Sequence, residues 1–150
     1  MFTPRLTNND VVLTPLVTDD EAIAKYTQWV NDENIAHWVD KSCSVITIDE
    51  EKKWATTPNG EMRFSIFVKK SSLSVDTTNY FYEEAHEQMV MVGTCSITLS
   101  RCNTNATLGI LIGEKFARGH GVGTTVINML TEYGRHLYDT VQASKLSKKH

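Results

Sequence analysis

Residues 106–125 read ATLGILIGEKFARGHGVGTT, an apolar β-branched run followed by a turn with glycine at every second position. The run from Ala106 to Ile112 predicts a strand that ends at Gly113. Apolar residues then recur at helical spacing and predict one apolar stripe on a helix of about four turns. These residues are Val122, Val126, Leu130, Tyr133 and Leu137.

The segments before this stretch predict further strands and helices. The expected elements are a strand at 11–16 that Pro15 confines to an edge or an end, a helix from 18–21 to 31–32, a helix at 49–56, a strand around 64–68 and a strand at 89–99. Ile48 and Trp54 are the side chains that the second helix can bury. Strands joined by hairpins, with helices packed on them, indicate an α+β domain with a mostly antiparallel sheet.

Three segments are less regular. Ser71 to Gln88 is rich in polar residues and reads as a long loop between two strands. Gly93 interrupts the strand at 89–99, which predicts a β-bulge or a close backbone approach. Residues 140–146 could begin another strand, but few residues follow them.

Composition bounds the class of protein. The chain has 150 residues with 41% hydrophobic and 22% charged residues, which predicts one folded domain over residues 1–150. A net charge of -3 provides no positive field for nucleic acid, and no apolar run approaches the roughly 20 residues of a membrane helix. We see no secretory leader and expect a cytoplasmic protein.

The cysteines indicate no metal centre. Cys43, Cys95 and Cys102 are three in number and lack C-x-x-C spacing, so neither a structural zinc nor a disulfide framework is expected. Cys95 lies in an apolar alternating run, where packing is the favoured role. A role for Cys95 beside a reactive thioester is the alternative.

The glycine turn has the properties of an anion site. Glycines at 119, 121 and 123 permit unusual dihedral angles, so that backbone N–H groups and a helix N-terminus can face one phosphate group. The turn lacks the Lys-Ser/Thr pair of a Walker loop and the spacing of a dinucleotide-binding motif. An ordinary strand-to-helix turn is the alternative interpretation.

The pattern R-x-x-G-x-G, formed by Arg118, Gly121 and Gly123, resembles the coenzyme A signature of the GNAT N-acetyltransferase superfamily. Residues 106–113 resemble the fourth strand of that family, and residues 26–32 resemble its first helix, in a form common among acetyltransferases of ribosomal-protein N-termini, amino sugars and aminoglycosides. The resemblance covers nearly the whole chain. It implies a GNAT-like fold and transfer of an acetyl group from acetyl-CoA to the primary amine of a small molecule or peptide.

The resemblance also implies roles for individual residues. Backbone groups of Leu111 and Ile112 would bind the pantetheine arm. The amides of the glycine turn would hold the pyrophosphate; they belong to Arg118, Gly119, His120, Gly121, Val122, Gly123 and Thr124. Direct transfer needs a general base, for which Glu114 is the first candidate, with a surface carboxylate as the alternative. His120 has a suitable intrinsic pKa, but its place in the turn favours a phosphate contact.

Recognition of the acceptor amine would fall to the first helix and the loop behind it. Trp29, Asn31, Asp32 and His37 are the candidate substrate-binding residues, because aromatic faces beside a carboxylate suit a cationic amine or a sugar. Trp29 as simple core and Asn31-Asp32 as a helix end are the alternatives. The acidic tract at 83–87 is either a flap over an amine or a solvated loop.

The chain departs from the family after the third helix. Members continue with a fifth strand, a fourth helix and a closing strand pair, whereas only residues 138–150 remain here. The domain is therefore expected to be C-terminally shortened, with apolar sheet surface that another copy of the chain could cover. A non-catalytic acetyl-CoA-binding or oligomer-forming protein is the alternative to an enzyme.

Overall fold

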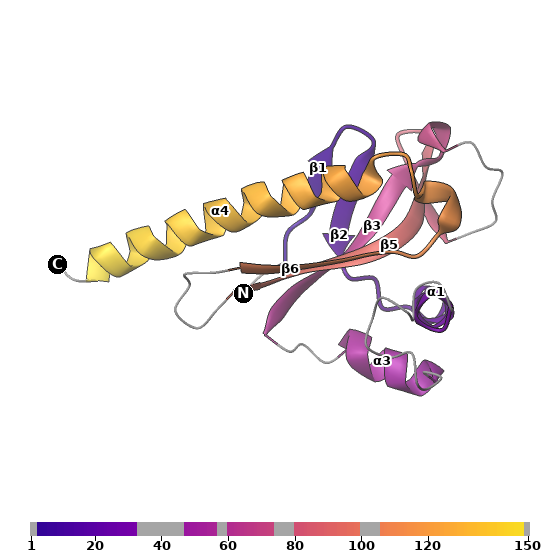
Figure 1. The fold of residues 1–150 in the computed structure, drawn as a ribbon, viewed down its shortest axis with the longest axis horizontal. Coiled ribbons are helices and arrows are strands. Elements are labelled where there is room, and N and C mark those ends of the chain that lie inside the picture. The colour runs from indigo at the N-terminus through magenta and orange to yellow at the C-terminus, as the bar shows by residue number, and fades with distance from the viewer. Residues whose placement is uncertain (1–2, 33–46, 57–59, 74–79, 100–105, 149–150) are drawn as a thin grey trace.

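The computed structural model describes residues 3–32, 47–56, 60–73, 80–99 and 106–148. Figure 1 shows a twisted sheet with helix α4 on one face and helices α1 and α3 on the other. The expected α+β class and mostly antiparallel sheet are confirmed, because every strand pair of the described sheet is antiparallel. The candidate site is built on the last strand of this sheet and on the turn into α4.

The sheet has six strands in the order β1-β2-β3-β5-β4, with β6 also paired to β5. The strands are β1 (Leu6–Asn8), β2 (Val11–Pro15), β3 (Glu61–Lys69), β4 (Phe81–Glu84), β5 (Glu87–Leu99) and β6 (Ala106–Ile112). β5 is long enough that β4 pairs with its first residues and β6 with its last seven along the same edge. Pro15 lies at the end of β2, as predicted.

Strand alternation buries two cores, one on each face. Leu13, Phe64 and Ile66 face α4, whereas Val12 and Phe67 face α1. The stripe predicted on the last helix is confirmed, since Val122, Val126, Leu130 and Leu137 are buried and Tyr133 packs against them. A chain with two buried sheet faces needs helices on both, which explains its layered architecture.

Helix α1 (Asp20–Val30) begins and ends where the sequence predicts. Asp19 is the N-cap, and its carboxylate accepts a hydrogen bond from the Ala22 N–H at 2.8 Å. Tyr26 is buried, and its hydroxyl is 2.7 Å from both the Val17 carbonyl oxygen and Ser65 Oγ. Burial is the main cause that raises the pKa of Tyr26 to about 12. This buried hydroxyl fixes α1 against β3.

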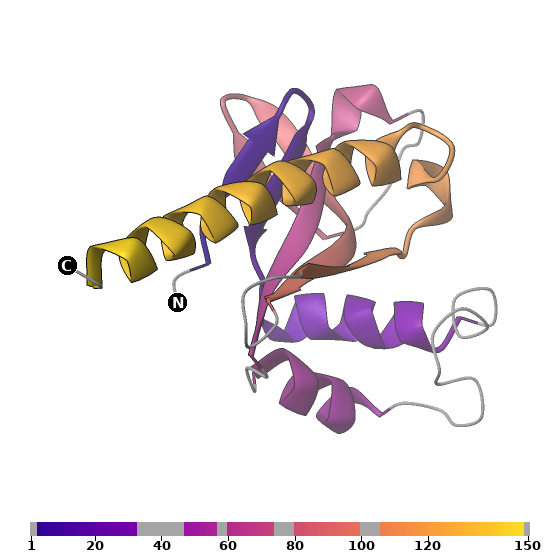
Figure 2. The same cartoon turned by 60° about the vertical axis from the view of Figure 1, so that its left-hand side comes forward.

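Helix α3 (Ile48–Thr56) confirms the second predicted helix but buries a different residue. The prediction for Ile48 was wrong, because its side chain is 57% exposed, whereas Glu51 is 3% exposed. α1 and α3 lie side by side beneath the sheet (Figure 2). The face of α3 that meets α1 therefore carries a carboxylate.

Helix α4 (Val122–Lys148) corrects the prediction for the end of the chain. Its 27 residues make it about 40 Å long at 1.5 Å per residue, not four turns. Residues 140–146 continue this helix and do not begin a strand. Its last turns project past the sheet in both views (Figures 1 and 2).

The predicted loop at 71–88 contains regular structure. A 3-10 turn at Lys70–Ser72 and strand β4 flank residues outside the description, and β4 forms a hairpin with β5. Phe67 and Tyr82 are in edge contact at 4.8 Å between ring centroids, which stabilises this hairpin on the α1 face. The acidic tract at 83–87 therefore spans the hairpin turn.

The β4–β5 turn gives a stability prediction. Its two central residues, Ala85 and His86, both have positive φ, at 50° and 66°, as a type I′ turn requires. Most residues with a Cβ are strained there, whereas Gly, which has none, and Asn, whose short polar side chain can hydrogen-bond locally, tolerate this conformation. Replacing Ala85-His86 by Asn-Gly should raise the free energy of unfolding by about 1 kcal/mol. Urea denaturation of both proteins measures it, and an unchanged or lower midpoint would contradict the assignment of strain.

No helix in the described ranges is long and apolar enough to cross a membrane.

Candidate functional site

The site is organised by a distortion where β5 meets β6. Ile66 pairs with Gly93 and Phe67 pairs with Met91, so Val92 is the extra residue of a bulge in β5. Its carbonyl oxygen accepts hydrogen bonds from the N–H groups of Gly113 at 2.8 Å and Glu114 at 3.2 Å. The predicted bulge at Gly93 is thus confirmed, and it anchors the end of β6.

The close approach predicted at Gly93 is also present. A Cβ on Gly93 would lie 2.0 Å from the Leu111 carbonyl oxygen, so only glycine fits between the strands here. The bulge and the glycine together let β6 turn off the sheet toward α4. Figure 1 shows this turn at the junction between β6 and the first turn of α4.

The outer edge of β6 directs backbone groups away from the sheet. The Gly113 N–H donates to the Val92 carbonyl oxygen, and in an antiparallel ladder hydrogen-bonded residue pairs alternate with pairs that are not hydrogen-bonded. The backbone groups of Leu111 therefore point toward its partner Thr94. The backbone groups of Ile110 and Ile112 point away from β5. No described strand pairs with that outer edge. The register therefore directs a strand-like ligand to Ile110 and Ile112, and assigns the backbone groups of Leu111 to the sheet.

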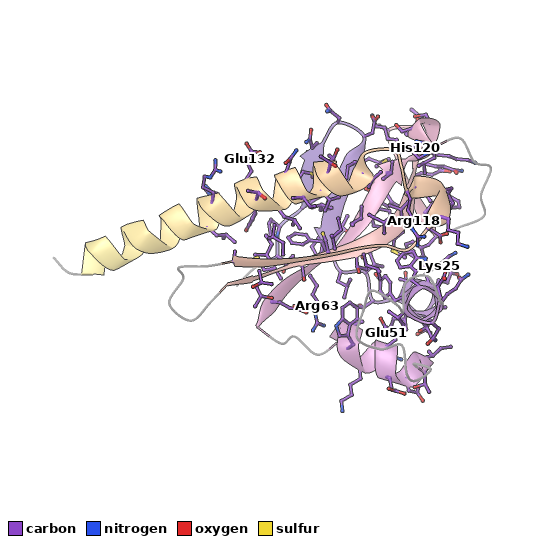
Figure 3. All side chains as sticks on the ribbon, in the orientation of Figure 1. Lys25, Glu51, Arg63, Arg118, His120 and Glu132 are labelled. Carbon is purple, nitrogen blue, oxygen red and sulfur yellow. The ribbon has the colours of Figure 1, made fainter. Side chains whose placement is uncertain are left out.

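Arg118 holds one of these outer positions. Its Nε and Nη2 atoms donate to the Ile112 carbonyl oxygen at 3.3 and 3.2 Å. The side chain of the first motif residue thus connects the glycine turn to the open edge of β6. Figure 3 shows Arg118 beside this edge, with His120 farther along toward α4.

The glycine turn has the geometry of an exposed backbone cradle. Gly119 and Gly121 have φ of 83° and 76°, and a Cβ on Gly119, Gly121 or Gly123 would meet no atom within 4 Å. The first hydrogen bond of α4 runs from the Thr125 N–H to the Gly121 carbonyl oxygen, so the N–H groups of residues 122–124 precede the helical ladder. These amides, with the helix dipole, favour an anion.

The side chains of the predicted turn residues differ in placement. Val122 is buried and belongs to the core, whereas His120 and Thr124 are exposed. His120 lines a cavity of about 190 Å³ shared with Asp10 and with Ser72, whose hydroxyl donates to the Asp10 carboxylate. The carboxylate makes that cavity unfavourable for phosphate. An anion therefore has better access from the exposed side of the glycines.

Glu114, the predicted base, is tied to α1. Its Oε1 accepts hydrogen bonds from Lys25 Nζ at 2.9 Å and from Trp29 Nε1 at 3.1 Å, and its side chain is 15% exposed. A cation and an indole N–H thus orient this carboxylate. These contacts connect α1 to the end of β6, which is a structural role.

A cavity of about 270 Å³ lies on the α1 face beside β6. Trp29 lines it, so the predicted substrate residue does reach a pocket, and a Cβ on Gly113 would lie 2.1 Å from its ring. The remaining described lining comes from α1, α3, β5 and β6. It consists of Tyr26, Val30, Glu51, Trp54, Thr94, Cys95, Ser96, Gly109, Ile110 and Leu111.

The other predicted substrate residues lie elsewhere. Asn31 is the C-cap of α1, and the Asp32 N–H donates to the Trp29 carbonyl oxygen at 3.2 Å, so this pair ends the helix. Neither residue lines the described cavity. His37 lies outside the described residues.

Cys95 is a packing residue. It is 4% exposed and reduced, and burial raises its thiol pKa to about 12, which opposes formation of a nucleophilic thiolate. Cys43 and Cys102 lie outside the described residues. Within the described ranges, no three His, Cys, Asp or Glu side chains are grouped as a metal site would need.

Sequence reasoning missed the contribution of α3 to the cavity. Glu51 and Trp54 are three residues apart and share one face of this helix. That spacing was the available signal, but a carboxylate in an acidic first turn is usually solvated. Burial of Glu51 depends on the packing of α3 against α1, which local sequence does not encode.

Comparison with known proteins gives a fold likeness. No family model and no curated protein matches this sequence. Among solved structures, the chain is similar to the crystal structure of a domain from Methanocaldococcus jannaschii DSM 2661, with a TM-score of 0.60 and 17% identity over 85% of this chain and 71% of that one. At this identity the likeness concerns the fold alone.

Proposed function

We propose that the protein binds acetyl-CoA at the glycine turn and the open edge of β6 and transfers the acetyl group to a primary amine, as the resemblance to GNAT N-acetyltransferases implies. The observation that carries the proposal is the turn itself. Its positive-φ glycines open a helix beside an outward-facing strand edge, so a pyrophosphate and a strand-like amide arm have adjacent places to bind. The activity is proposed for the cytoplasm.

The residues present fit this cofactor. The positions that a Cβ would fill at Gly119, Gly121 and Gly123 are open, which leaves room for phosphate oxygens against the backbone. Ile110 and Ile112 supply outward backbone groups for the amides of a pantetheine arm. When bound, acetyl-CoA supplies an activated thioester whose carbonyl carbon accepts an amine.

The roles of the chain in this reaction are binding and orientation. The amides of the turn hold the anionic end, and the Ile112 carbonyl oxygen would exchange its contact with Arg118 for a ligand N–H. The hydrogen bond between Trp29 and Glu114 fixes α1 at the end of β6. The separation between the cavity beside Gly109 and Leu111 and the outer edge of β6 is therefore constant. A base near this cavity would deprotonate the acceptor ammonium before attack.

Acetyl-CoA should raise the melting temperature of a cofactor-free preparation. At about 100 times the dissociation constant, binding adds about 2.7 kcal/mol to the stability of the native state. For a chain of this length we expect a rise of about 5 to 10 °C. Gly121→Ala should abolish most of this rise, because the methyl group strains a residue with φ of 76° and occupies the cradle. Differential scanning calorimetry measures both.

Gly60→Ala is the matched control. Gly60 has φ of 73° with no atom within 4 Å of its Cβ position, so this variant carries the same backbone strain at a turn before β3, away from the cradle. It should lose stability like Gly121→Ala and keep the full response to acetyl-CoA. Absence of any response in the folded wild type would contradict cofactor binding.

A non-catalytic role in binding or assembly is the second candidate. It is favoured by Glu114, whose Oε1 is committed to Lys25 and Trp29, and by the open edge of β6, which a strand of another copy could cover. An amine panel monitored for thiol release separates the two candidates. Light scattering of the same sample reports whether a homo-oligomer forms.

A further inference from the structure

The cavity beside β6 is a hollow that small residues leave above the sheet. Thr94, Ser96 and Gly109 line it from the α1 face of β5 and β6, and Ser96 pairs with Gly109 across the two strands. Nearby positions on the same face carry the larger side chains of Met91 and Leu111. The small residues therefore leave a space of about 270 Å³ between the sheet and the two helices that cover this face (Figure 2).

Aromatic rings form the walls of this cavity. Tyr26 and Trp29 are buried residues of α1, and Trp54 comes from α3. The Tyr26 ring centroid is 5.8 Å from that of Trp29 and 6.3 Å from that of Trp54. The Tyr26 hydroxyl donates to the Val17 carbonyl oxygen at 2.7 Å, and Trp29 Nε1 donates to Glu114 at 3.1 Å. Neither acceptor lines the cavity, so these two walls offer ring surface to a ligand.

The floor of the cavity supplies neutral hydrogen-bonding groups. Thr94 and Ser96 are two residues apart on β5, so both side chains lie on its α1 face. A hydroxyl group has one donor and two acceptor lone pairs, and it rotates to suit its partner. A ligand that carries one hydroxyl group can therefore both donate and accept at this floor.

The wall from α3 favours neither sign of ligand charge. Glu51 lines the cavity from this helix, and the Arg63 guanidinium lies over the Trp54 ring at 4.6 Å. Figure 3 shows both side chains on the side of the sheet that α1 and α3 cover. An acidic and a basic group at one wall provide no single counter-charge for a cation or an anion. A neutral ligand needs none, since hydroxyl groups and aromatic rings bind it directly.

We propose that this cavity binds a small neutral aromatic compound with one hydroxyl group, its ring against Tyr26, Trp29 and Trp54 and its hydroxyl at Thr94 and Ser96. Burial removes the ring from water, and contacts with the walls replace empty space. The volume of about 270 Å³ exceeds the roughly 150 Å³ of an engineered cavity that binds benzene and lies below the roughly 300 Å³ of the smallest drug-sized sites. One ring with a short substituent fits this range.

The cavity also reaches the proposed cofactor edge. Ile110 lines it, is 38% exposed, and belongs to the strand edge proposed for the pantetheine arm. An amine substituent on the bound ring would approach the thioester from this end of the cavity. As an acceptor site this inference rests on the proposed function, whereas binding of a neutral aromatic alcohol stands without it.

The test is isothermal titration of the protein with para-cresol in the absence of acetyl-CoA. We expect saturable binding, and binding of toluene about fivefold weaker, because one neutral hydrogen bond contributes about that factor. The saturated analogue 4-methylcyclohexanol should also bind about fivefold more weakly, since it keeps the hydroxyl and lacks the aromatic ring. These comparisons use the wild-type chain and need no variant to fold. Binding of para-cresol that is absent, or no tighter than that of either analogue, would overturn the proposal.

Thr94→Val combined with Ser96→Ala locates the hydroxyl contact. This double variant should weaken para-cresol binding about fivefold and leave toluene binding unchanged. Thr98→Val is the matched control, because it removes a hydroxyl from the same face of β5 that donates to Glu61 at 3.3 Å and does not line the cavity. It should change para-cresol binding less than about twofold. Equal loss in the control, or no loss in the double variant, would overturn the placement at Thr94 and Ser96.

Acetyl-CoA then separates the two proposals. If para-cresol binds and acetyl-CoA fails to shift the melting temperature, the proposed function fails and the aromatic site stands. If acetyl-CoA binds and para-cresol does not, the inference fails and cofactor binding stands. Tyramine, which carries a phenol and a primary amine, should be acetylated with a lower KM than 2-phenylethylamine, and the double variant should abolish this difference. A KM for tyramine no lower than that for 2-phenylethylamine would overturn the acceptor role.

Discussion

Gly93→Ala is expected to lower the free energy of unfolding by about 3 kcal/mol or more, because its new Cβ would lie 2.0 Å from the Leu111 carbonyl oxygen. The obstacle is backbone, so no change of rotamer relieves the contact. β6 would have to separate from β5 at Gly93, where the bulge anchors its end. The variant should therefore lose order in β6 first.

Chemical denaturation measures the loss, and hydrogen exchange of the β6 amides locates it. Gly134→Ala is the opposite control, because Gly134 lies in α4 with no atom within 4 Å of its Cβ position. Alanine is better than glycine inside a helix by about 1 kcal/mol, so this variant should be more stable than the wild type. A Gly93→Ala protein within 0.5 kcal/mol of the wild type, on the order of ordinary surface substitutions, would contradict the close approach.

Features set by local chemistry were predictable from the sequence. The cap at Asp19 and the turn at Asn31 set the bounds of α1, since a capping carboxylate and a helix end act over a few residues. The interruption at Gly93 predicted a bulge or a close approach, and the structure has both. The apolar stripe of α4 followed from helical spacing alone.

Features set by pairing across the sheet were not predictable. β1 is three residues long and exists because Leu6 to Asn8 pair with Val11 to Leu13. β4 was predicted to be part of a loop, because its sequence contains two glutamates and lacks the apolar pattern of a strand. Its stability comes from pairing with β5 and from the contact between Tyr82 and Phe67. The sequence of residues 140–146 allowed a strand to begin there, whereas in the structure these residues continue α4.

The candidate site divides in the same way. The glycine turn is local, so its place between β6 and α4 was predictable. The roles of Leu111 and Ile112 depend on the register with β5, which assigns one to the ladder and the other to the open edge. The partners of Glu114 come from α1, about 85 to 89 residues earlier, and no sequence pattern places them.

Gly113→Ala is expected to damage the cavity as well as the fold. A Cβ there would lie 2.1 Å from Cδ2 and 2.2 Å from Cγ of Trp29, a residue that is only 2% exposed. To relieve this contact, the indole must move into the cavity that it lines or α1 must shift from the end of β6. We expect a loss of about 3 kcal/mol of stability and a break in the Trp29–Glu114 hydrogen bond. Tryptophan fluorescence and urea denaturation measure both effects.

Gly109→Ala is the matched control for this prediction. Gly109 lies on β6, the strand that ends just before Gly113, and it lines the cavity that Trp29 also lines. Its Cβ would meet Ser96 Oγ at 2.8 Å, a side chain that can rotate away. It should cost less than about 1 kcal/mol and leave the Trp29 emission unchanged. Equal stability and equal Trp29 emission in Gly113→Ala and Gly109→Ala would contradict the close contact between Gly113 and the Trp29 ring. If the emission changes in Gly113→Ala alone while its sheet remains folded, the contact between α1 and the end of β6 sets the shape of the cavity that Trp29 lines.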